Sequence, residues 1–318
     1  MRADTPVSVP DPQPLKEVES RVKITHSESD MIRPLDWNGY DAACALILLF
    51  FAAFTRFWII QYPRHYVYQE DRYITYINSY LNGSYFVDSQ PPLATMLAAG
   101  VAYLMPYEQV YKPPSLESNF TYPTMDYVSL RSTTAYLGIP VVPLIYFAIR
   151  AFGGSRLVAL LGGVSVLCDF ILVATERHIF VDGFVHLFVA LFLFTTAMLT
   201  RFVPHSLSWK LLLGLQSISL GCSMASSFST FPLLFFALIF HFWKHRTAKP
   251  LAINAVVALV IFFGAYSAHV ILLPYRSTLD GASPLMKDFL VDRTKPRVTN
   301  HSTILRRMKY SIKATFTV

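Results

Sequence analysis

The stretch AACALILLFFAAFTRFWII, residues 42–60, decides the fold because Arg56 is its only charged side chain. A helix needs roughly 20 mostly apolar residues to cross the hydrocarbon core of a bilayer, and about 17 are still workable. The stretch is therefore predicted to be a membrane-spanning helix. Comparable apolar windows follow at residues 133–149, 157–175, 178–200, 211–224, 228–243 and 251–273.

The composition agrees with a membrane protein. Hydrophobic residues make up 53% of the 318 residues and charged residues only 15%, whereas about 25% charged residues is usual in a soluble domain. Between residues 127 and 279 the acids are Asp169, Glu176 and Asp182. The sequence therefore predicts an all-α polytopic membrane protein with about seven transmembrane helices. The fifth and sixth windows are the shortest, so the division between them is the least clear.

Basic residues gather at alternate junctions between these windows, at Arg150, Arg156, Arg201, Lys210, Lys244, Arg246 and Lys249. The opposite short junctions hold only Arg177. An excess of Lys and Arg in short loops marks the cytosolic side. The pattern predicts a cytosolic disordered tail at 1–40 and a transmembrane domain at 41–273, with a long lumenal loop at 61–130. A lumenal tail follows at 274–318. The net charge of +7 thus reflects membrane orientation, and we expect no nucleic-acid partner.

The acceptor sites for N-glycosylation support the same orientation. Asn-x-Ser/Thr sequences lie at Asn82, Asn119 and Asn300. All of them fall in segments that the charge pattern assigns to the lumen, and such sites are modified on surface loops of secretory proteins.

No metal site is expected. Cys44, Cys168 and Cys222 lie in apolar windows at spacings that fit neither a zinc site nor a disulfide framework. His186 and His269 lie on apolar faces, where we expect hydrogen-bonded packing residues.

Some acids near the spans need a polar partner. Asp169 lies inside an apolar window, and the pattern does not identify its partner. Asp182 lies one turn into the fourth span and can either pair with Arg177 or take part in catalysis.

The loop at 61–130 is too long for a simple connector. Gln69-Glu70-Asp71-Arg72 places acids and a base just beyond the first span. Residues 73–86 then carry apolar and aromatic side chains at helical spacing, which predicts an amphipathic helix on the membrane surface. Gly83 is suited to end this helix in a left-handed conformation. The apolar stretch 93–105 is too short to span, so we expect it to re-enter the membrane or lie at its surface.

The charged residues at the start of this loop suit an enzyme that acts on a lipid-carried substrate. A carboxylate there can accept a proton from a hydroxyl group, and the planar guanidinium of an Arg can hold a phosphate. A solvated cluster at the start of a helix accounts for Glu70, Asp71 and Arg72 equally well. The residues alone leave both interpretations open.

Residues 61–97 resemble the protein O-mannosyltransferases. The family's first lumenal loop has Asp-Glu after the first span, then an aromatic-rich helix, a Gly and the motif Asp-x-His-Pro-Pro-Leu. This chain has Gln69-Glu70, then Gly83, then Asp88-Ser89-Gln90-Pro91-Pro92-Leu93. Further similar stretches follow in the same order, at Leu130-Arg131 with Ala135 to Gly138, at Arg177 to Asp182, and at Ser219-Leu220-Gly221-Cys222.

The resemblance implies a GT-C-type membrane domain in the endoplasmic reticulum that carries mannose from dolichyl phosphate to Ser or Thr of secretory proteins. It implies no cofactor beyond this lipid-linked donor, and it allows a dimer with a related subunit. Glu70 would act as base, with Asp71 in reserve. Donor-binding residues would be Arg131, Arg177, Asp88, Gln90, Pro91 and Pro92.

The chain also departs from the family pattern. Gln69 replaces the first acid of the Asp-Glu pair, and an amide cannot accept a proton at neutral pH. Gln90 replaces the His of the Pro-Pro motif. The lumenal trefoil domain and the later spans of the family are not in this sequence. These departures favour the alternative of a non-catalytic subunit that pairs with an active mannosyltransferase.

The predicted topology can be tested by glycosylation. Asn119 should be glycosylated when the chain is translated with microsomes, because it lies well inside loop 61–130. The expected result is an endoglycosidase-sensitive mobility shift that is absent from Asn119→Gln. An unmodified Asn119, together with modified reporter sites at 201–210 or 244–249, would show that the orientation is inverted.

Overall fold

The computed structural model describes residues 31–32, 35–67, 69–105, 127–245, 249–276, 290, 308–309, 311–313 and 315. The acceptor residues Asn119 and Asn300 lie outside the described residues. So do most of the predicted tails at 1–40 and 274–318 and part of the predicted loop 61–130.

The described chain is built from helices. In order they are α2 (Gly39–Phe57), α3 (Glu70–Asn82), α4 (Leu93–Leu104), α5 (Tyr127–Gly138), α6 (Val141–Phe152), α7 (Arg156–Leu167), α8 (Phe170–Glu176), α9 (Asp182–Leu199), α10 (Leu207–Met224), η1 (Phe228–Thr230), α11 (Pro232–His245) and α12 (Lys249–Leu272). The extended pairings within the described residues are the isolated bridges Met31–Phe202 and Ser84–Tyr275. The predicted all-α class is confirmed.

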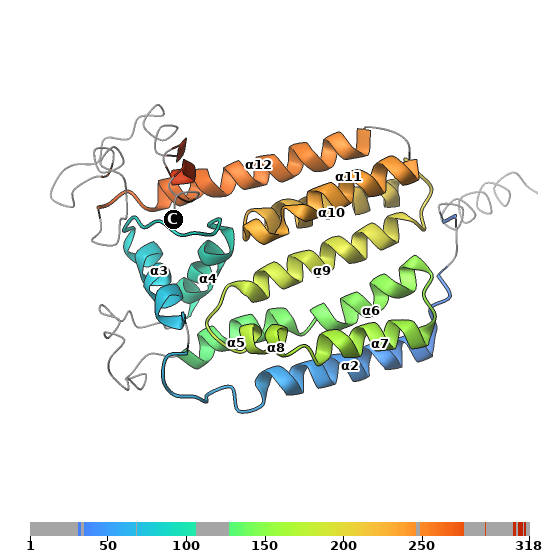
Figure 1. Ribbon diagram of the computed structural model, residues 1–318, viewed down its shortest axis with the longest axis horizontal. Coiled ribbons are helices and arrows are strands. Elements are labelled where there is room, and N and C mark those ends of the chain that lie inside the picture. Colours follow the sequence, from blue (N-terminus) through green and yellow to red (C-terminus); the bar gives the residue numbers. More distant parts are fainter. Residues whose placement is uncertain are drawn as a thin grey trace, which may run out of the picture.

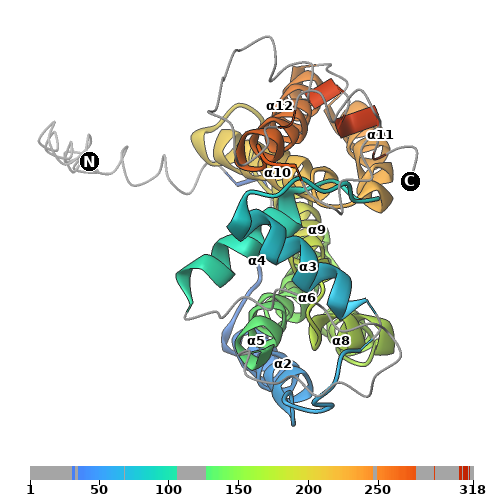
Figure 2. The same cartoon turned by 90° about the vertical axis from the view of Figure 1, so that its left-hand side faces the viewer.

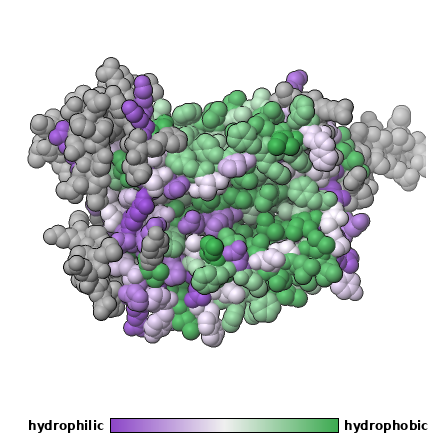
Figure 3. Space-filling view, in the orientation of Figure 1, coloured by the Kyte–Doolittle hydropathy of each residue, from purple (hydrophilic) through white to green (hydrophobic). Residues whose placement is uncertain are grey.

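The long helices form a bundle. In Figure 1, α2, α6, α7, α9, α10, α11 and α12 run side by side along the long axis of the molecule, and α3 and α4 lie across one end. Figure 2 views this end and shows α3 and α4 in front of the bundle. Hydrophobic residues cover most of the middle of the face in Figure 3, and hydrophilic residues gather toward both ends. This distribution suits a bundle whose middle faces lipid.

The described residues include helices that are long and apolar enough to cross a membrane. These are Gly39–Phe57, Tyr127–Phe152, Asp182–Leu199 and Lys249–Leu272, and the pair α7 and α8, bent by 54°, can form one more span. Helices α10 and α11 lie beside them in the bundle but do not pass the same test. The chain is thus a multi-pass membrane protein, and the number of about seven spans stays a prediction.

Asp169 explains the bend between α7 and α8. Its carboxylate accepts hydrogen bonds from the backbone N–H groups of Ile171 (2.9 Å) and Leu172 (3.0 Å), so it caps the start of α8. Asp is among the preferred residues at this position because its oxygen satisfies N–H groups that the helix leaves unpaired. The polar partner that the sequence did not identify is therefore the helix backbone.

The end of the bundle that holds the start of α2 is joined by charged residues. Asp41 accepts hydrogen bonds from Tyr146 Oη and Arg150 Nε, both at 2.8 Å, and from Arg156 Nε at 3.4 Å. Arg201 donates to the carbonyl oxygens of residues 150 and 151. Basic residues from successive junctions thus meet at one end, as the charge pattern predicts.

Helix α3 lies at the opposite end; it begins earlier than predicted and ends at Gly83, as predicted. It runs from Glu70 to Asn82, and Gly83 ends it in the left-handed region with φ 66°. Its apolar face does not lie open to lipid. Ile74 and Ile77 are each 1% exposed and pack with Ala94 and Ala98 of α4 and with residues of α5 and α9. The helix is amphipathic, as predicted, but its apolar face packs against other helices of the protein and not against the membrane surface.

A cluster of polar side chains lies inside the apolar bundle, between α9, α10, α11 and α12. Gln216 Nε2 donates to Thr196 Oγ1 (2.7 Å), and Gln216 Oε1 accepts from Asn254 Nδ2 (3.1 Å). His241 Nε2 lies 3.0 Å from the same Oε1, and the Ser217 hydroxyl bonds to Asn254. All five side chains are fully buried. Such bonds hold helices together where lipid offers no partner.

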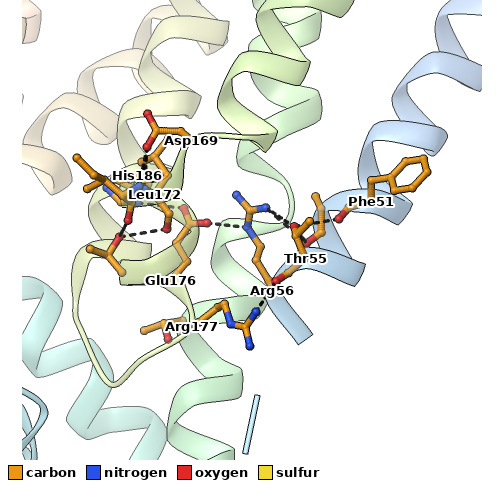
Figure 4. A network of polar contacts seen from close by, with 12 residues as sticks. Phe51, Thr55, Arg56, Asp169, Leu172, Glu176, Arg177 and His186 are labelled. Carbon is orange, nitrogen blue, oxygen red and sulfur yellow. Dashed lines mark hydrogen bonds and ion pairs between the residues drawn. The ribbon is translucent and has the colours of Figure 1, made fainter. Parts of the chain in front are cut away.

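A second network joins α2, α8 and α9 (Figure 4). Arg56 Nε lies 2.6 Å from Glu176 Oε2, and both side chains are 0% exposed. The other oxygen of Glu176 lies 3.0 Å from His186 Nδ1. The cation in the first apolar window therefore meets an acid that directly follows the third window. Pairing with Arg177 was one of two roles expected for Asp182, and these residues form no ion pair with each other among the described residues.

Gly138 of α5 makes this network possible. A Cβ atom at this position would lie 2.2 Å from Glu176 Oε2 and 2.9 Å from Arg56 Nε. We expect Gly138→Ala to lower the free energy of unfolding by about 1–3 kcal/mol, since overpacking must displace a buried ion pair. Thermal unfolding in detergent measures the effect.

Gly214→Ala in α10 is the matched control. An added Cβ there meets nothing within 4 Å, and Ala is the better helix former, by roughly 0.8–1.0 kcal/mol. The control should leave the unfolding midpoint unchanged or raise it. Equal midpoints for both variants would contradict the packing argument.

Candidate functional site

The residues that the sequence singled out meet at one end of the bundle. Gln69 to Arg72 begin α3, and Asp88 to Pro92 form the turn that leads into α4. Arg131 comes from α5, and Arg177 follows α8. The structure pairs Glu70 with Arg131, and Arg72 with Asp88.

Glu70 and Arg131 form a bidentate ion pair. Arg131 Nη2 lies 2.7 Å from Glu70 Oε2, and Arg131 Nε lies 2.9 Å from Oε1. Glu70 also accepts hydrogen bonds from the backbone N–H groups of Val67 and Ile179, both at 2.9 Å. Both side chains of the pair are 0% exposed. The carboxylate thus joins the start of α3 to α5 and to the segment before α9.

This environment changes the acidity of Glu70. Burial by itself raises the pKa of the carboxyl group, but the hydrogen bonds and charge of Arg131 outweigh it, so the pKa lies below its usual value. A carboxylate with a low pKa and no exposed surface is a weak proton acceptor. The geometry gives Glu70 a structural task, and its predicted role as a base stays a prediction.

Arg131 uses its remaining donors on the chain that follows α2. Its Nη1 donates to the carbonyl oxygens of Pro63 (2.8 Å) and Ile60 (3.3 Å), and its Nη2 to that of His65 (3.4 Å). The guanidinium also lies 5.0 Å from the centre of the Tyr127 ring. In this arrangement Arg131 has no exposed face for a phosphate group.

Arg177 is more accessible. It is partly exposed, and its Nη1 and Nη2 donate to the carbonyl oxygens of Thr55 (3.1 Å) and Trp58 (2.6 Å). Among the described residues, no carboxylate forms an ion pair with it. Of the two predicted phosphate-binding arginines, Arg177 is the one whose charge remains open to an anion.

Gln69 precedes α3 in an unusual backbone conformation. Its φ is 66°, in the left-handed region, and its side chain makes no capping hydrogen bond. Its carbonyl oxygen accepts hydrogen bonds from Arg72 and Tyr73 and so starts the helix. Asp71 is partly exposed in the first turn.

Asp88 and Arg72 form the second ion pair. Arg72 Nη2 lies 2.5 Å from Asp88 Oδ1 and 3.0 Å from Ser89 Oγ, and Arg72 Nε donates to Tyr76 Oη at 2.9 Å. Asp88 is only 8% exposed. Burial raises the pKa of this carboxyl group even though Arg72 acts in the opposite direction. Asp88 therefore differs from Glu70, whose pKa is lowered.

The remaining residues of the Asp88–Leu93 motif connect this turn to α4 and to the segment that follows α10. Gln90 Oε1 accepts hydrogen bonds from Phe228 N (3.1 Å) and Ser227 Oγ (3.2 Å). Pro91 and Pro92 are buried, and Pro92 directly precedes α4. The predicted donor-binding role of these three residues has no direct support in their contacts, which hold the turn in place.

Two small cavities are described at this end of the bundle. One, of about 10 Å³, is lined by residues that include Asp88, Gln90, Thr95, His269, Ser311 and Thr315. Another of similar size lies among Tyr73, Ile77, Leu130, Thr134, Phe180 and Phe184. Asp88 is the one acid among the described residues that line either cavity.

The two histidines are hydrogen-bonded packing residues, as predicted. His269 Nδ1 lies 2.6 Å from Tyr80 Oη, and its ring contacts Tyr85 and Phe86. His186 bonds to Glu176.

Sequence reasoning missed the pairs Glu70–Arg131, Arg72–Asp88 and Arg56–Glu176. Each of these charged residues lies close to an apolar stretch, and such a position indicates that the charge has a partner. Spacing cannot identify that partner, because two of these pairs join residues 61 and 120 positions apart.

Comparison with known proteins gives the same family over most of the chain. The model of the dolichyl-phosphate-mannose-protein mannosyltransferase family matches residues 46–281. Dolichyl-phosphate-mannose–protein mannosyltransferase 4 of Candida albicans is 29% identical over 192 residues, which cover 59% of this chain and 25% of that protein. Protein O-mannosyltransferase 1 of Drosophila melanogaster is 28% identical over 225 residues, covering 68% and 25%. The chain thus spans about a quarter of the length of these curated relatives.

A solved structure has the same fold. It is the S. cerevisiae protein O-mannosyltransferase Pmt1-Pmt2 complex bound to the sugar donor. The match has a TM-score of 0.68 at 23% sequence identity and covers 82% of this chain and 38% of the chain in the complex. The helical arrangement therefore follows that of a known GT-C membrane protein.

The two arginines should differ in their effect on stability. Arg131→Ala leaves Glu70 buried without its cation, so we expect a loss of about 3–5 kcal/mol. Arg177→Ala removes two hydrogen bonds to carbonyl groups at a partly exposed site and should cost about 1–2 kcal/mol.

Thermal unfolding of the purified protein in detergent compares them. The double variant Glu70→Gln with Arg131→Met removes both charges and should recover part of the loss. Equal unfolding midpoints for Arg131→Ala and Arg177→Ala would refute the structural role of the Glu70–Arg131 pair.

Proposed function

Because the chain belongs to the dolichyl-phosphate-mannose-protein mannosyltransferase family, we propose that it transfers mannose from dolichyl phosphate mannose to Ser and Thr hydroxyl groups of secretory-pathway proteins. The family match over residues 46–281 is the observation that carries this proposal. In the reaction the hydroxyl oxygen forms a bond to the anomeric carbon of mannose, and the bond from that carbon to the phosphate breaks. The lipid-linked donor supplies the activated sugar, and no separate cofactor takes part.

Arg177 is the residue we propose for the donor phosphate. It has no acid partner among the described residues, and its guanidinium is anchored on the carbonyl groups of Thr55 and Trp58 at the end of α2. An open groove lined by Phe54, Phe57, Trp58, Ile59 and Gln61 lies beside it. The arrangement suits a lipid phosphate whose apolar chain lies along α2 in the bilayer. A fixed cation there stabilises the negative charge that develops on the leaving phosphate.

Orientation follows from the two ends of the bundle. We place α3, α4 and Arg177 in the lumen of the endoplasmic reticulum, and the start of α2 in the cytosol. The support is the distribution of basic residues, because Arg150, Arg156 and Arg201 meet at the end opposite to α3. Pairing with a related subunit belongs to the same proposal, since the solved structure with this fold is a complex of two proteins.

Donor binding tests the role of Arg177. Arg177→Ala should weaken binding of dolichyl phosphate mannose roughly 10- to 100-fold, which corresponds to the loss of about 1.5–3 kcal/mol for a hydrogen bond to a charged group. Arg177→Lys should restore binding only in part, because Lys lacks the planar fork.

Arg64→Ala is the matched control. Arg64 is exposed near the same end, where its guanidinium lies over the Tyr62 ring, so its removal should leave donor binding unchanged. Full binding by Arg177→Ala would remove Arg177 from the proposed site. Donor binding without mannosyl transfer by the natural gene product would point instead to the non-catalytic subunit.

A further inference from the structure

Few acids at this end of the bundle can accept a proton from a hydroxyl group. Position 69 carries an amide, and Glu70 is fully buried and bonded to Arg131 and to two backbone N–H groups. Asp71 and Asp182 are both partly exposed, and neither lines one of the two cavities described at this end. Asp88 is the carboxylate that reaches a cavity.

The cavity beside Asp88 contains hydroxyl groups of the acceptor type. Ser311 and Thr315 line it together with Asp88, and their side chains are 3% and 7% exposed. They come from a segment that packs against α12, where Met308 lies 3.0 Å from the Ser267 hydroxyl. The carboxylate therefore faces a small space that is bordered by Ser and Thr hydroxyl groups of this chain.

Asp88 is also held against the first turn of α3, the helix that begins directly after Gln69. Arg72 lies in the first turn of α3, and its backbone N–H donates to the carbonyl oxygen of Gln69 (3.1 Å). The guanidinium of Arg72 forms an ion pair with Asp88, with Nη2 2.5 Å from Oδ1. A carboxylate attached to Arg72 can thus serve the region that an acid at position 69 would serve.

We propose that Asp88 accepts the proton of the acceptor hydroxyl in this chain, in place of a carboxylate at position 69. This inference rests on the proposed function. The hydroxyl oxygen bonds to the anomeric carbon of mannose, and its proton moves to the Asp88 carboxylate. The bond between that carbon and the phosphate oxygen breaks, and its electron pair leaves with dolichyl phosphate. Arg72 positions Asp88 for this step.

The acidity of the group supports its role. Burial raises the pKa of Asp88 above its usual value, and a carboxyl group with a higher pKa is a stronger base when ionised. Glu70 shows the opposite shift.

The size of the cavity adds a condition. Its volume of about 10 Å³ is that of roughly one water molecule. A peptide acceptor therefore reaches Asp88 only when the side chains of Ser311 and Thr315 move aside.

Mannosyl transfer to a Ser/Thr-containing peptide tests the proposal, with the natural gene product in microsomes and dolichyl phosphate mannose as donor. Asp88→Asn should lower the rate about 10²- to 10⁴-fold, the usual contribution of a general base, while donor binding is kept. Asp169→Asn is the matched control, because Asn caps a helix as well as Asp does, and it should transfer at the unchanged rate.

Two further variants separate catalysis from folding. The single variant Asp88→Asn leaves Arg72 without its acid. The double variant Asp88→Asn with Arg72→Gln removes both charges. It should show the same loss of rate, and its unfolding midpoint should be near that of the natural protein. Gln69→Asp combined with Asp88→Asn should restore transfer, because Asp tolerates the left-handed conformation at position 69 and returns a carboxylate to this region.

The outcomes distinguish the inference from the proposed function. Full transfer by Asp88→Asn overturns the inference and leaves the function standing. Transfer that appears in Gln69→Asp but not in the natural sequence also overturns it, since Asp88 would then supply no base. Absence of transfer in both the natural sequence and Gln69→Asp overturns the proposed function itself.

Discussion

A charge enclosed by apolar helices needs a partner, and the end of the bundle that holds α3 is arranged around one such ion pair. Arg131 of α5 and Glu70 of α3 meet in a bidentate contact without exposed surface. In a low dielectric, an unpaired charge costs several kcal/mol, so this pair fixes where α3 begins relative to α5. The remaining donors of Arg131 hold residues 60 to 65. The turn with Asp88 and the cavity beside it depend on the position of α3.

The same constraint acts elsewhere in the bundle. Arg56 and Glu176 connect α2 to α8 deep in the structure, and Gln216 connects α9, α10, α11 and α12 through hydrogen bonds alone. Apolar contacts give such helices little preference for one neighbour, since lipid is as apolar as a Leu side chain. Buried polar pairs therefore contribute much of the specificity with which these helices are arranged.

The charges at the end of the bundle divide into two groups. Glu70 and Arg131 satisfy each other and form the scaffold. Arg177 and Asp88 are each held in place by neighbours but keep a surface or a cavity beside them. Sugar transfer needs a cation for the leaving phosphate and a base for the attacking hydroxyl. In the proposed reaction Arg177 and Asp88 are the residues suited to these tasks, although the first acid of the family pattern is Gln69 in this chain.

The sequence by itself determined the membrane class, because long apolar windows permit few other structures. Through the placement of Arg and Lys it also determined which junctions lie at the same end of the bundle, and it determined the helix that ends at Gly83. It identified Arg131 and Glu70 as members of one site but assigned them to substrate. Only the tertiary structure decided that they bind each other and that Arg56 meets Glu176. The physical reason is that the local sequence pattern indicates which face of a helix is apolar. The pairing of buried charges depends instead on which helices pack side by side.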